Sequence, residues 1–349
     1  MLSDMLAENE KLIQNVPAPV LIIGFNRPDL LKNVLSFFSN TTRSIYISID
    51  GPRNLLEKTL TEECRLVAEN YKISHKNKVS IRINTVNLGC KLGVTSAIDW
   101  AFEFEEYLVI LEDDISISQN FLDFCDLGLI YFQANKKIFQ LSGWTPLLPE
   151  FKPPEVYLTR FSHIWGWATW KDRWALFDSN LESWDNFPPS DLPIFHDAHL
   201  HKNFDSFWRN NLANIKAGAT DIWDVQWMYS MWSNQRFAVS PGLSLCKNIG
   251  FDDRATHTLA LPENMFKYQR KTYLADPLEV NLDWLVAFKD VDSSFIWDIY
   301  HEKIAFNMDF YNLNSISDNK RHLLGKILSI LHLKKLVKNL YSSYLQRNF

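Results

Sequence analysis

The sequence lacks the features by which several common protein classes are recognised. Its four cysteines, Cys64, Cys90, Cys125 and Cys246, form no C-x-x-C pair, and no histidine stands near them at the spacing of a zinc site. No stretch approaches the roughly 18 uninterrupted apolar residues of a transmembrane helix. The first residues, MLSDMLAENEKLIQNV, have neither the basic start nor the apolar run of a signal peptide. We therefore expect a reduced, cytoplasmic protein.

Signatures of phosphate-binding loops and an excess of basic residues are also lacking. Neither G-x-G-x-x-G nor the P-loop pattern occurs, and NLGCKLG (87–93) is too weak by itself to indicate a phosphate loop. The net charge of −5 at pH 7 argues against nucleic acid as the main partner. No internal repeat is present.

The first 143 residues alternate between the periodicities of strands and helices. Expected strands are 18–25, 44–50, 78–84, 107–111 and 138–143, and expected helices are 27–38, 55–71, 93–104 and 120–132. Pro28 suits a first helical turn, and Ser118 is a candidate N-cap. Alternation of this kind predicts an α/β fold with a mainly parallel, Rossmann-like sheet that has helices on both sides.

The character of the chain changes after residue 143. Ten of the 13 tryptophans lie between Trp144 and Trp232, and we interpret 144–318 as an elaboration of the same sheet. Trp170 and Trp174, four positions apart, are expected in the core. The tail 319–349 carries seven Lys and Arg and no Asp or Glu. It is expected to form a basic amphipathic helix that lies on an anionic membrane. Docking on the protein or on a second subunit remains an alternative.

Polar groups follow four of the expected strands. They are Asn26 to Pro28, Asp50, Asn87 to Gly93, and the acidic run Glu112, Asp113 and Asp114. Ligands of parallel α/β sheets bind at the carboxyl ends of the strands. Mg²⁺ and Mn²⁺ take carboxylate oxygens and share their coordination with substrate phosphates. The acidic run therefore predicts a divalent cation that relieves the repulsion between its carboxylates, and a solvated acidic turn is the alternative.

The sequence also resembles a known family. LVILEDDISISQNFLDF, QLSGW and YLTRFSHIWGWATW are similar to the metal-site segment, the segment after it and the acceptor-side loop of GT-A fold glycosyltransferases. The resemblance is to the Golgi N-acetylglucosaminyltransferases that add the first branching GlcNAc to N-glycans. WDVQWM and NIGFDDRATHT match more loosely, and the similarity spans about residues 19–257.

This resemblance implies roles on the donor side of the site. Asp114 should bind Mn²⁺ (or Mg²⁺), and Glu112 and Asp113 should contact the donor sugar or ribose. Arg27 should approach the nucleotide, and Asp50 should accept a hydrogen bond from uracil. The family has a histidine near the base where this chain has none, so Asn87 or Lys91 would take its place.

The resemblance implies further roles around the reacting sugar. Asp224 falls where the family has its general base, with Asp221 as the rival. If the stretch is helical, the two share a face; ordinary N-terminal helix charges are the alternative. Trp165 and Trp167, which flank Gly166, are candidates for stacking on an acceptor sugar, and core packing is the alternative. Arg254 and His257 are candidates for a lid over the diphosphate, and a structural role is the alternative for His257.

Together these expectations describe a metal-dependent inverting glycosyltransferase. Its donor would be a UDP-sugar, with GlcNAc or a related hexose first, and its acceptor a glycan or lipid-linked glycan of bacterial surface polysaccharide synthesis. It would work in the cytoplasm or at the inner membrane face. A sugar-binding module without catalysis is the alternative. A sugar nucleotidyltransferase ranks lower, because GFNRPD replaces the Gly-rich loop that this class needs after its first strand.

Overall fold

A computed structural model of the chain describes residues 17–75, 78–145, 156–185 and 204–251. They belong to the first of two compact units, Met1–Ile296; the second, Trp297–Phe349, lies outside the described residues. The expected tail 319–349 and the lid candidates Arg254 and His257 also lie outside them.

The first part of the chain has the alternation that the sequence predicts. Its strands are β1 (Val20–Gly24), β2 (Ile45–Ile49), β3 (Val79–Ile83), β4 (Tyr107–Glu112), β5 (Ile115–Ile117) and β6 (Ile138–Ser142). Its helices are α2 (Pro28–Phe37), α3 (Leu55–Ser74), α4 (Gly89–Phe102) and α5 (Gln119–Tyr131). Pro28 opens α2, and the Ser118 side chain accepts a hydrogen bond from Phe121 N, so both predicted helix starts are confirmed. The short β5 was not expected, and α4 begins four residues before the predicted start.

The second part adds strands to the sheet and helices around it. It contains β7 (Val156–Thr159), β8 (Trp167–Trp170), α6 (Lys171–Trp174), a 3-10 turn (Glu182–Asp185), α7 (Phe204–Lys216), α8 (Asp224–Ser233), β9 (Phe237–Pro241) and β10 (Cys246–Asn248).

One eight-stranded sheet, ordered β3-β2-β1-β4-β8-β6-β9-β7, joins strands from both parts of the chain. The neighbours β3, β2, β1 and β4 run parallel, as do β6 and β9. Strand β8 is antiparallel to both β4 and β6, and β7 is antiparallel to β9. The sheet is thus mixed, and its fully parallel portion comes from the first part of the chain. A separate two-stranded sheet pairs β10 with β5.

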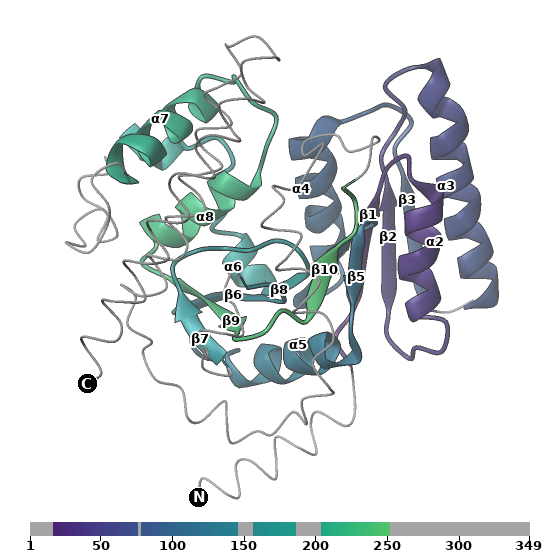
Figure 1. The fold of residues 1–349 in the computed structure, drawn as a ribbon, viewed down its shortest axis with the longest axis horizontal. Helices are drawn as coiled ribbons and strands as arrows, with labels where there is room; N and C mark the ends of the chain where they lie inside the picture. Colours follow the sequence, from purple (N-terminus) through teal and green to yellow (C-terminus); the bar gives the residue numbers. More distant parts are fainter. Residues whose placement is uncertain (1–16, 76–77, 146–155, 186–203, 252–349) are drawn as a thin grey trace, which may run out of the picture. The chain divides into compact units, whose positions relative to one another are not determined.

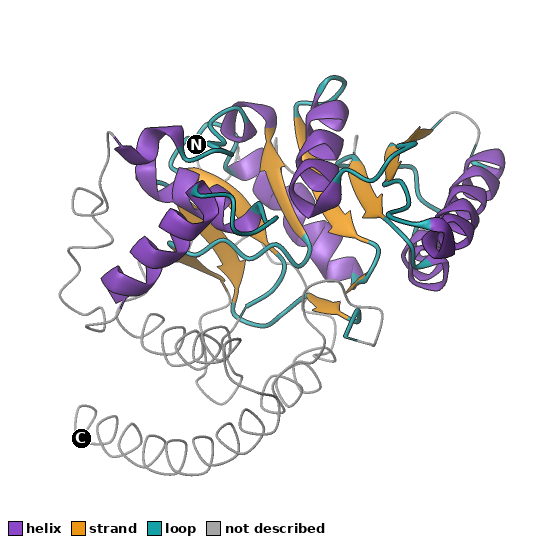
Figure 2. Cartoon of the chain, turned by 90° about the horizontal axis from the view of Figure 1, so that it is seen from above, coloured by secondary structure: helices purple, strands orange, loops and turns teal. Residues whose placement is uncertain are grey.

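Helices cover both faces of the parallel strands (Figures 1 and 2). Figure 1 shows α4 on one side of β1 and β2, and α2 and α3 on the other. Successive side chains of a strand point to opposite faces of the sheet, so apolar strand residues can pack against helices on both faces. Val20 and Ile22 of β1 join a buried cluster with residues of α2, α3 and α5, whereas α4 contacts β1 and β4 from the other side.

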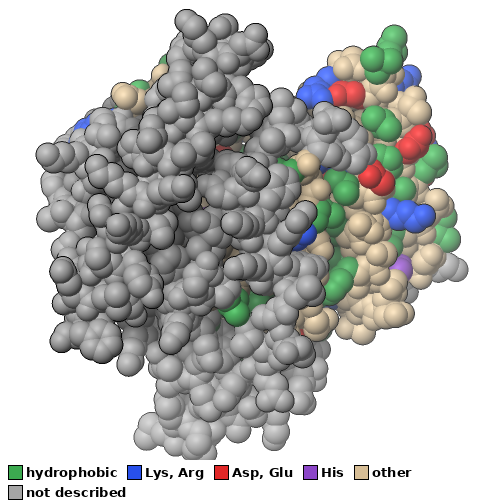
Figure 3. Space-filling model, in the orientation of Figure 1, with side chains coloured by type: hydrophobic (Ala, Val, Ile, Leu, Met, Phe, Trp, Pro, Cys, Tyr) green, Lys and Arg blue, Asp and Glu red, His purple; other side chains and the backbone are tan. Residues whose placement is uncertain are grey.

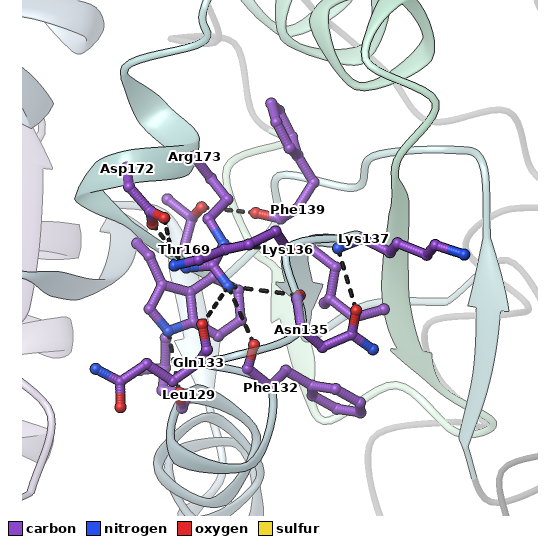
Figure 4. Close-up of polar contacts among 12 residues, drawn as sticks. Leu129, Phe132, Gln133, Asn135, Lys136, Lys137, Phe139, Thr169, Asp172 and Arg173 are labelled. Atoms are coloured by element: carbon purple, nitrogen blue, oxygen red, sulfur yellow. Dashed lines mark hydrogen bonds and ion pairs between the residues drawn. The ribbon is translucent and has the colours of Figure 1, made fainter.

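A buried arginine secures the junction between α5 and β6 (Figure 4). The Arg173 guanidinium donates to the carbonyls of Phe132 and Gln133, which follow α5, at 3.1 and 2.7 Å. It also stacks on Trp170, 4.2 Å from the ring centroid, and donates to Asp172. The end of a helix leaves carbonyls without intrahelical partners; Arg173 supplies a donor to Gln133 O and a second donor to Phe132 O, which also accepts from Asn135 N at 3.0 Å.

The tryptophans of the second part mostly pack inside. Trp170 and Trp174 are buried, as predicted. On the face that Figure 3 shows, charged side chains of both signs are interspersed where the described residues are visible. On α3, for example, Arg65 pairs with Glu62 and Glu69. Within the described residues, no helix has the length and apolar character that crossing a membrane requires.

Candidate active site

The four polar segments that follow β1 to β4 meet at one edge of the sheet. Because these strands are adjacent and parallel, their carboxyl ends lie side by side. The backbone at the tip of β4 confirms the proximity, since Asp113 N donates to Ile23 O of β1 at 2.9 Å. The sequence prediction of a polar edge is therefore correct.

Asp50, just after β2, organises the loop between β3 and α4. Its carboxylate accepts hydrogen bonds from the side chains of Asn84 and Asn87, each at 3.0 Å, and from Leu88 N at 3.1 Å. The backbones of the two loops also approach closely, because a Cβ on Gly51 would clash with the backbone of Val86. Asp50 thus holds the loop, and most of its acceptor capacity is in use.

The acidic run lies at the tip of β4, and its members point in different directions. Asp113 is buried and accepts a hydrogen bond from Phe25 N at 3.2 Å. The half-buried Glu112 interacts electrostatically with Asp224 and Cys90, whereas Asp113 interacts with Cys64 of α3. The two neighbours therefore face opposite sides of the sheet, as strand alternation predicts.

Burial and mutual repulsion disfavour charge on two of these carboxyls. Desolvation is the largest cause that raises the pKa of Glu112 above its ordinary value, and Asp114 and Asp113 add to it. Desolvation and then Asp114 likewise raise the pKa of Asp113. A bound cation would relieve both effects, because an opposite charge nearby favours the ionised form.

Asp114 lies between the guanidinium of Arg27 and the backbone at Gly250, which is distant in the sequence. Its Oδ2 accepts from Arg27 Nη1 at 3.2 Å, in an ion pair of which both side chains are largely buried. The pairing of β5 with β10 brings Gly250 over this pair, and a Cβ on Gly250 would clash with Asp114 Oδ2 and lie 2.6 Å from Arg27 Nη1. No local pattern predicts this approach, since Gly250 stands 136 positions after Asp114.

Asp224 is the first residue of α8 and reaches the same edge. It is half-buried, and its charge acts on Glu112 and on Cys90. Trp223, just before it, and Trp227, one turn later, are buried in the aromatic packing around Trp167, which fixes the start of α8. A carboxylate from α8 thus lies near the acidic run of β4.

The rival base Asp221 occupies a different position. It precedes α8, so the stretch from Asp221 to Asp224 is not helical and the condition under which the two aspartates would share a face is not met. Its oxygens accept hydrogen bonds from Cys90 N at 2.7 Å and Lys91 N at 3.1 Å, in the first turn of α4. The Lys91 ammonium points instead to Asn180, to which it donates at 3.1 Å.

The acceptor-side candidates separate into one accessible ring and one core residue. Trp167 lies in β8, is 1% exposed and stacks on Trp223 with centroids 5.7 Å apart, so a sugar cannot reach it. The prediction for Trp167 is wrong, because the residue after Gly166 already belongs to a central strand. Trp165 is half-buried and packs edge-on against Trp144 and Phe251. Gly166 has a φ of +68°, which lets the chain turn between the two rings.

A divalent cation fits the chemistry of this edge only if protein carboxylates and a bound phosphate share its coordination. In the part of the chain that the structure describes, no three His, Cys, Asp or Glu side chains are arranged to hold a metal ion by themselves. Mg²⁺ is commonly held by one or two carboxylates and completes its coordination with phosphates and water. Asp114, beside two carboxyls that burial keeps from ionising freely, suits that mode.

Comparisons of the chain with models of known protein families and with curated proteins find no match.

Proposed function

We propose that the chain is a metal-dependent, inverting glycosyltransferase of GT-A fold that moves a sugar from a UDP-sugar to a hydroxyl of a glycan. One observation carries this proposal. Asp224 and the acidic run of β4, about 110 positions apart in the sequence, come within electrostatic range of each other at the carboxyl edge of the sheet. A metal-binding carboxylate and a separate general base at one edge are what a one-step displacement requires.

The donor would bind across the ends of β1, β2 and β4. Asp114 would hold Mn²⁺ or Mg²⁺, which when bound stabilises a departing diphosphate as a Lewis acid. Arg27 lies beside Asp114 and carries a largely buried guanidinium that suits bidentate phosphate contacts. Glu112 and Asp113 would accept hydrogen bonds from the donor sugar or ribose, and Asn87 or Lys91 would lie near the uracil. Asp50 would act chiefly by holding the loop that carries Asn87.

Asp224 would take the proton from the acceptor hydroxyl. A general base of this kind contributes roughly 10²–10⁴-fold to a rate. Trp223 and Trp227, which adjoin it in the sequence, are buried, and we propose that this apolar packing keeps Asp224 fixed at the edge. Trp165, whose ring remains partly accessible, would stack on an acceptor sugar.

The wider role we propose is surface polysaccharide synthesis in a bacterium, with GlcNAc or a related hexose as the sugar. The acceptor would be a glycan or lipid-linked glycan, and the basic tail 319–349 would attach the enzyme to the inner membrane face. A sugar-binding module without catalysis would bind the same ligands but release no UDP.

The test begins with thermal unfolding in the presence of different nucleotide sugars, with and without Mn²⁺. One donor should stabilise the chain in a Mn²⁺-dependent way, because ligand binding to the folded state raises stability by mass action. The wild-type chain should then release UDP from that donor when an acceptor is added. Asp224→Asn should keep donor binding and lower turnover by at least about 10². Full activity of this variant would contradict the role of Asp224, and binding without UDP release would favour the sugar-binding module.

A further inference from the structure

The start of α4 is capped by a residue from a distant segment. Helix α4 has no side-chain cap of its own, because Leu88 occupies the N-cap position and the first turn carries no acidic residue. The first N–H groups of a helix need acceptors. Asp221 supplies them through its hydrogen bonds to Cys90 N and Lys91 N.

The backbone at this junction makes room for the Asp221 carboxylate. Gly89, the first residue of α4, has a φ of +78°, in the left-handed region that favours glycine. A Cβ at Gly89 would clash with Asp221 Oδ2. The contact therefore depends on two residues more than 130 positions apart, and either Asp221→Ala, which removes the acceptors, or Gly89→Ala, which adds a Cβ, should break it.

The same helix start is tied to the donor side of the site. Leu88 N, one residue before α4, donates to Asp50, and Asn87 donates to Asp50 as well. Three residues after Asp221, the chain reaches Asp224 and enters α8. The first turn of α4 thus lies between the loop that Asp50 holds and the segment that carries Asp224.

We propose that Asp221 is a positioning residue that anchors the start of α8 to α4 and so holds Asp224 at the acidic run. This inference rests on the proposed function. Both Asp221 oxygens accept backbone hydrogen bonds, so Asp221 holds the segment and does not itself remove a proton. Misplacing a catalytic group by about 1 Å can cost about 10²-fold in rate, so the anchor has a measurable consequence.

The anchor itself can be tested without any activity. Cys90 is half-buried, whereas Cys64, Cys125 and Cys246 are buried, so a neutral maleimide reports mainly on Cys90 in the folded protein. Asp221→Ala and Gly89→Ala should each speed labelling of Cys90 by at least about fivefold. In both variants the first turn of α4 becomes more accessible, and the Asp221 carboxylate is no longer held near the Cys90 thiol, which favours the reactive thiolate. Mass spectrometry of the Cys90 peptide gives the rate. Unchanged labelling in both variants would overturn the anchor.

Asn54→Ala is the matched control for this experiment. Asn54 caps α3 by accepting a hydrogen bond from Glu57 N at 3.0 Å, and Asn54→Ala likewise removes a side-chain acceptor from the start of a helix. It should leave the labelling of Cys90 unchanged. Equal acceleration in this variant would show that any loss of stability exposes Cys90, and would overturn the specific role of Asp221.

Kinetics then decide between positioning and proton removal. Asp221→Ala should lower kcat by about 10-fold to 10²-fold with little change in the KM for the donor. Asp221→Asn keeps one acceptor oxygen and should retain most of the activity and the wild-type pH profile of kcat. If Asp221→Asn instead loses as much activity as Asp224→Asn while labelling stays slow, Asp221 is the base and the proposal fails. Absence of transfer by the wild-type chain would overturn the proposed function. The labelling rates would still show whether Asp221 anchors the start of α8 to α4.

Discussion

The carboxylates near the candidate site differ in what their oxygens contact, and these contacts separate their roles. Asp50 accepts from two asparagines and a backbone amide, and Asp221 accepts from two backbone amides. Their oxygens hold loops in place. Asp114 pairs with an arginine, and Glu112 interacts with Asp224 across the edge. In the proposed function, the carboxylates that take part in the chemistry are Asp114, Glu112 and Asp224, whose neighbours are charged side chains.

Replacing Asp114 by Asn should remove the dependence of stability on a divalent cation. With UDP and Mn²⁺ at about 100 times the dissociation constant, the wild type should gain about 2.7 kcal/mol, and the variant should gain much less. Thermal unfolding with and without Mn²⁺ measures the difference. Asp126→Asn is the control, because the Arg43–Asp126 ion pair is as buried as the Arg27–Asp114 pair. The same loss of Mn²⁺ response in both variants would contradict the assignment.

His163 should make the chain less stable in mild acid. The residue is buried against Trp144, and burial lowers the pKa of His163 from 6.5 to about 3. The unfolded chain protonates below pH 6.5 while the folded chain keeps the ring neutral, so stability falls as pH falls from 6.5 toward 3. The loss should reach about 2 kcal/mol at pH 5. Urea unfolding at pH 7 and pH 5 should show a shallower decrease in His163→Gln, and identical decreases would contradict the prediction.

At the scale of elements, some helices start at a residue set by their own segment, and others start where a residue distant in the sequence supplies the cap. Pro28 and Ser118 act within their own segments, and both helix starts could be predicted. The start of α4 could not, because its cap comes from Asp221. The predicted start at Gly93 relied on apolar spacing, which does not report a cap from elsewhere in the chain.

The junction of α5 and β6 should depend strongly on Arg173. Arg173→Met keeps much of the apolar stem but removes the donor of the partly buried Gln133 carbonyl and one of the two donors of the buried Phe132 carbonyl, which should cost about 1–3 kcal/mol. Arg65→Met, which removes surface ion pairs on α3, should cost at most about 1 kcal/mol. Free energies from urea unfolding give both values. A similar cost in the two variants would show that the buried contacts contribute little.

At the scale of the whole described sheet, the two parts of the chain should unfold together. The pairing of β8 with β4 and β6 makes one continuous sheet. Tryptophan emission mostly reports the second part, and labelling of the buried Cys64 on α3 reports the first. Their unfolding midpoints should coincide. Thr169→Val, which removes a buried hydrogen bond to Phe139 O, should lower the free energy of unfolding by about 1 kcal/mol and shift both midpoints by the same amount. Separate midpoints would show that the sheet is not one cooperative unit.

Apart from β5 and the start of α4, the sequence by itself determined the elements of the first part, and it also determined the polar edge after β1 to β4. Apolar periodicity, Pro28, Ser118 and the acidic run after β4 all act between near neighbours along the chain, so local patterns report them.

Only the tertiary structure decided which distant segments meet. It placed β8 between β4 and β6, which buried Trp167, and it brought Asp221 to α4 and Gly250 to Asp114. A short apolar run is compatible with many partners, and the entropy of closing a loop changes slowly with its length. The choice among partners therefore depends on how the whole core packs, which no local stretch of sequence contains.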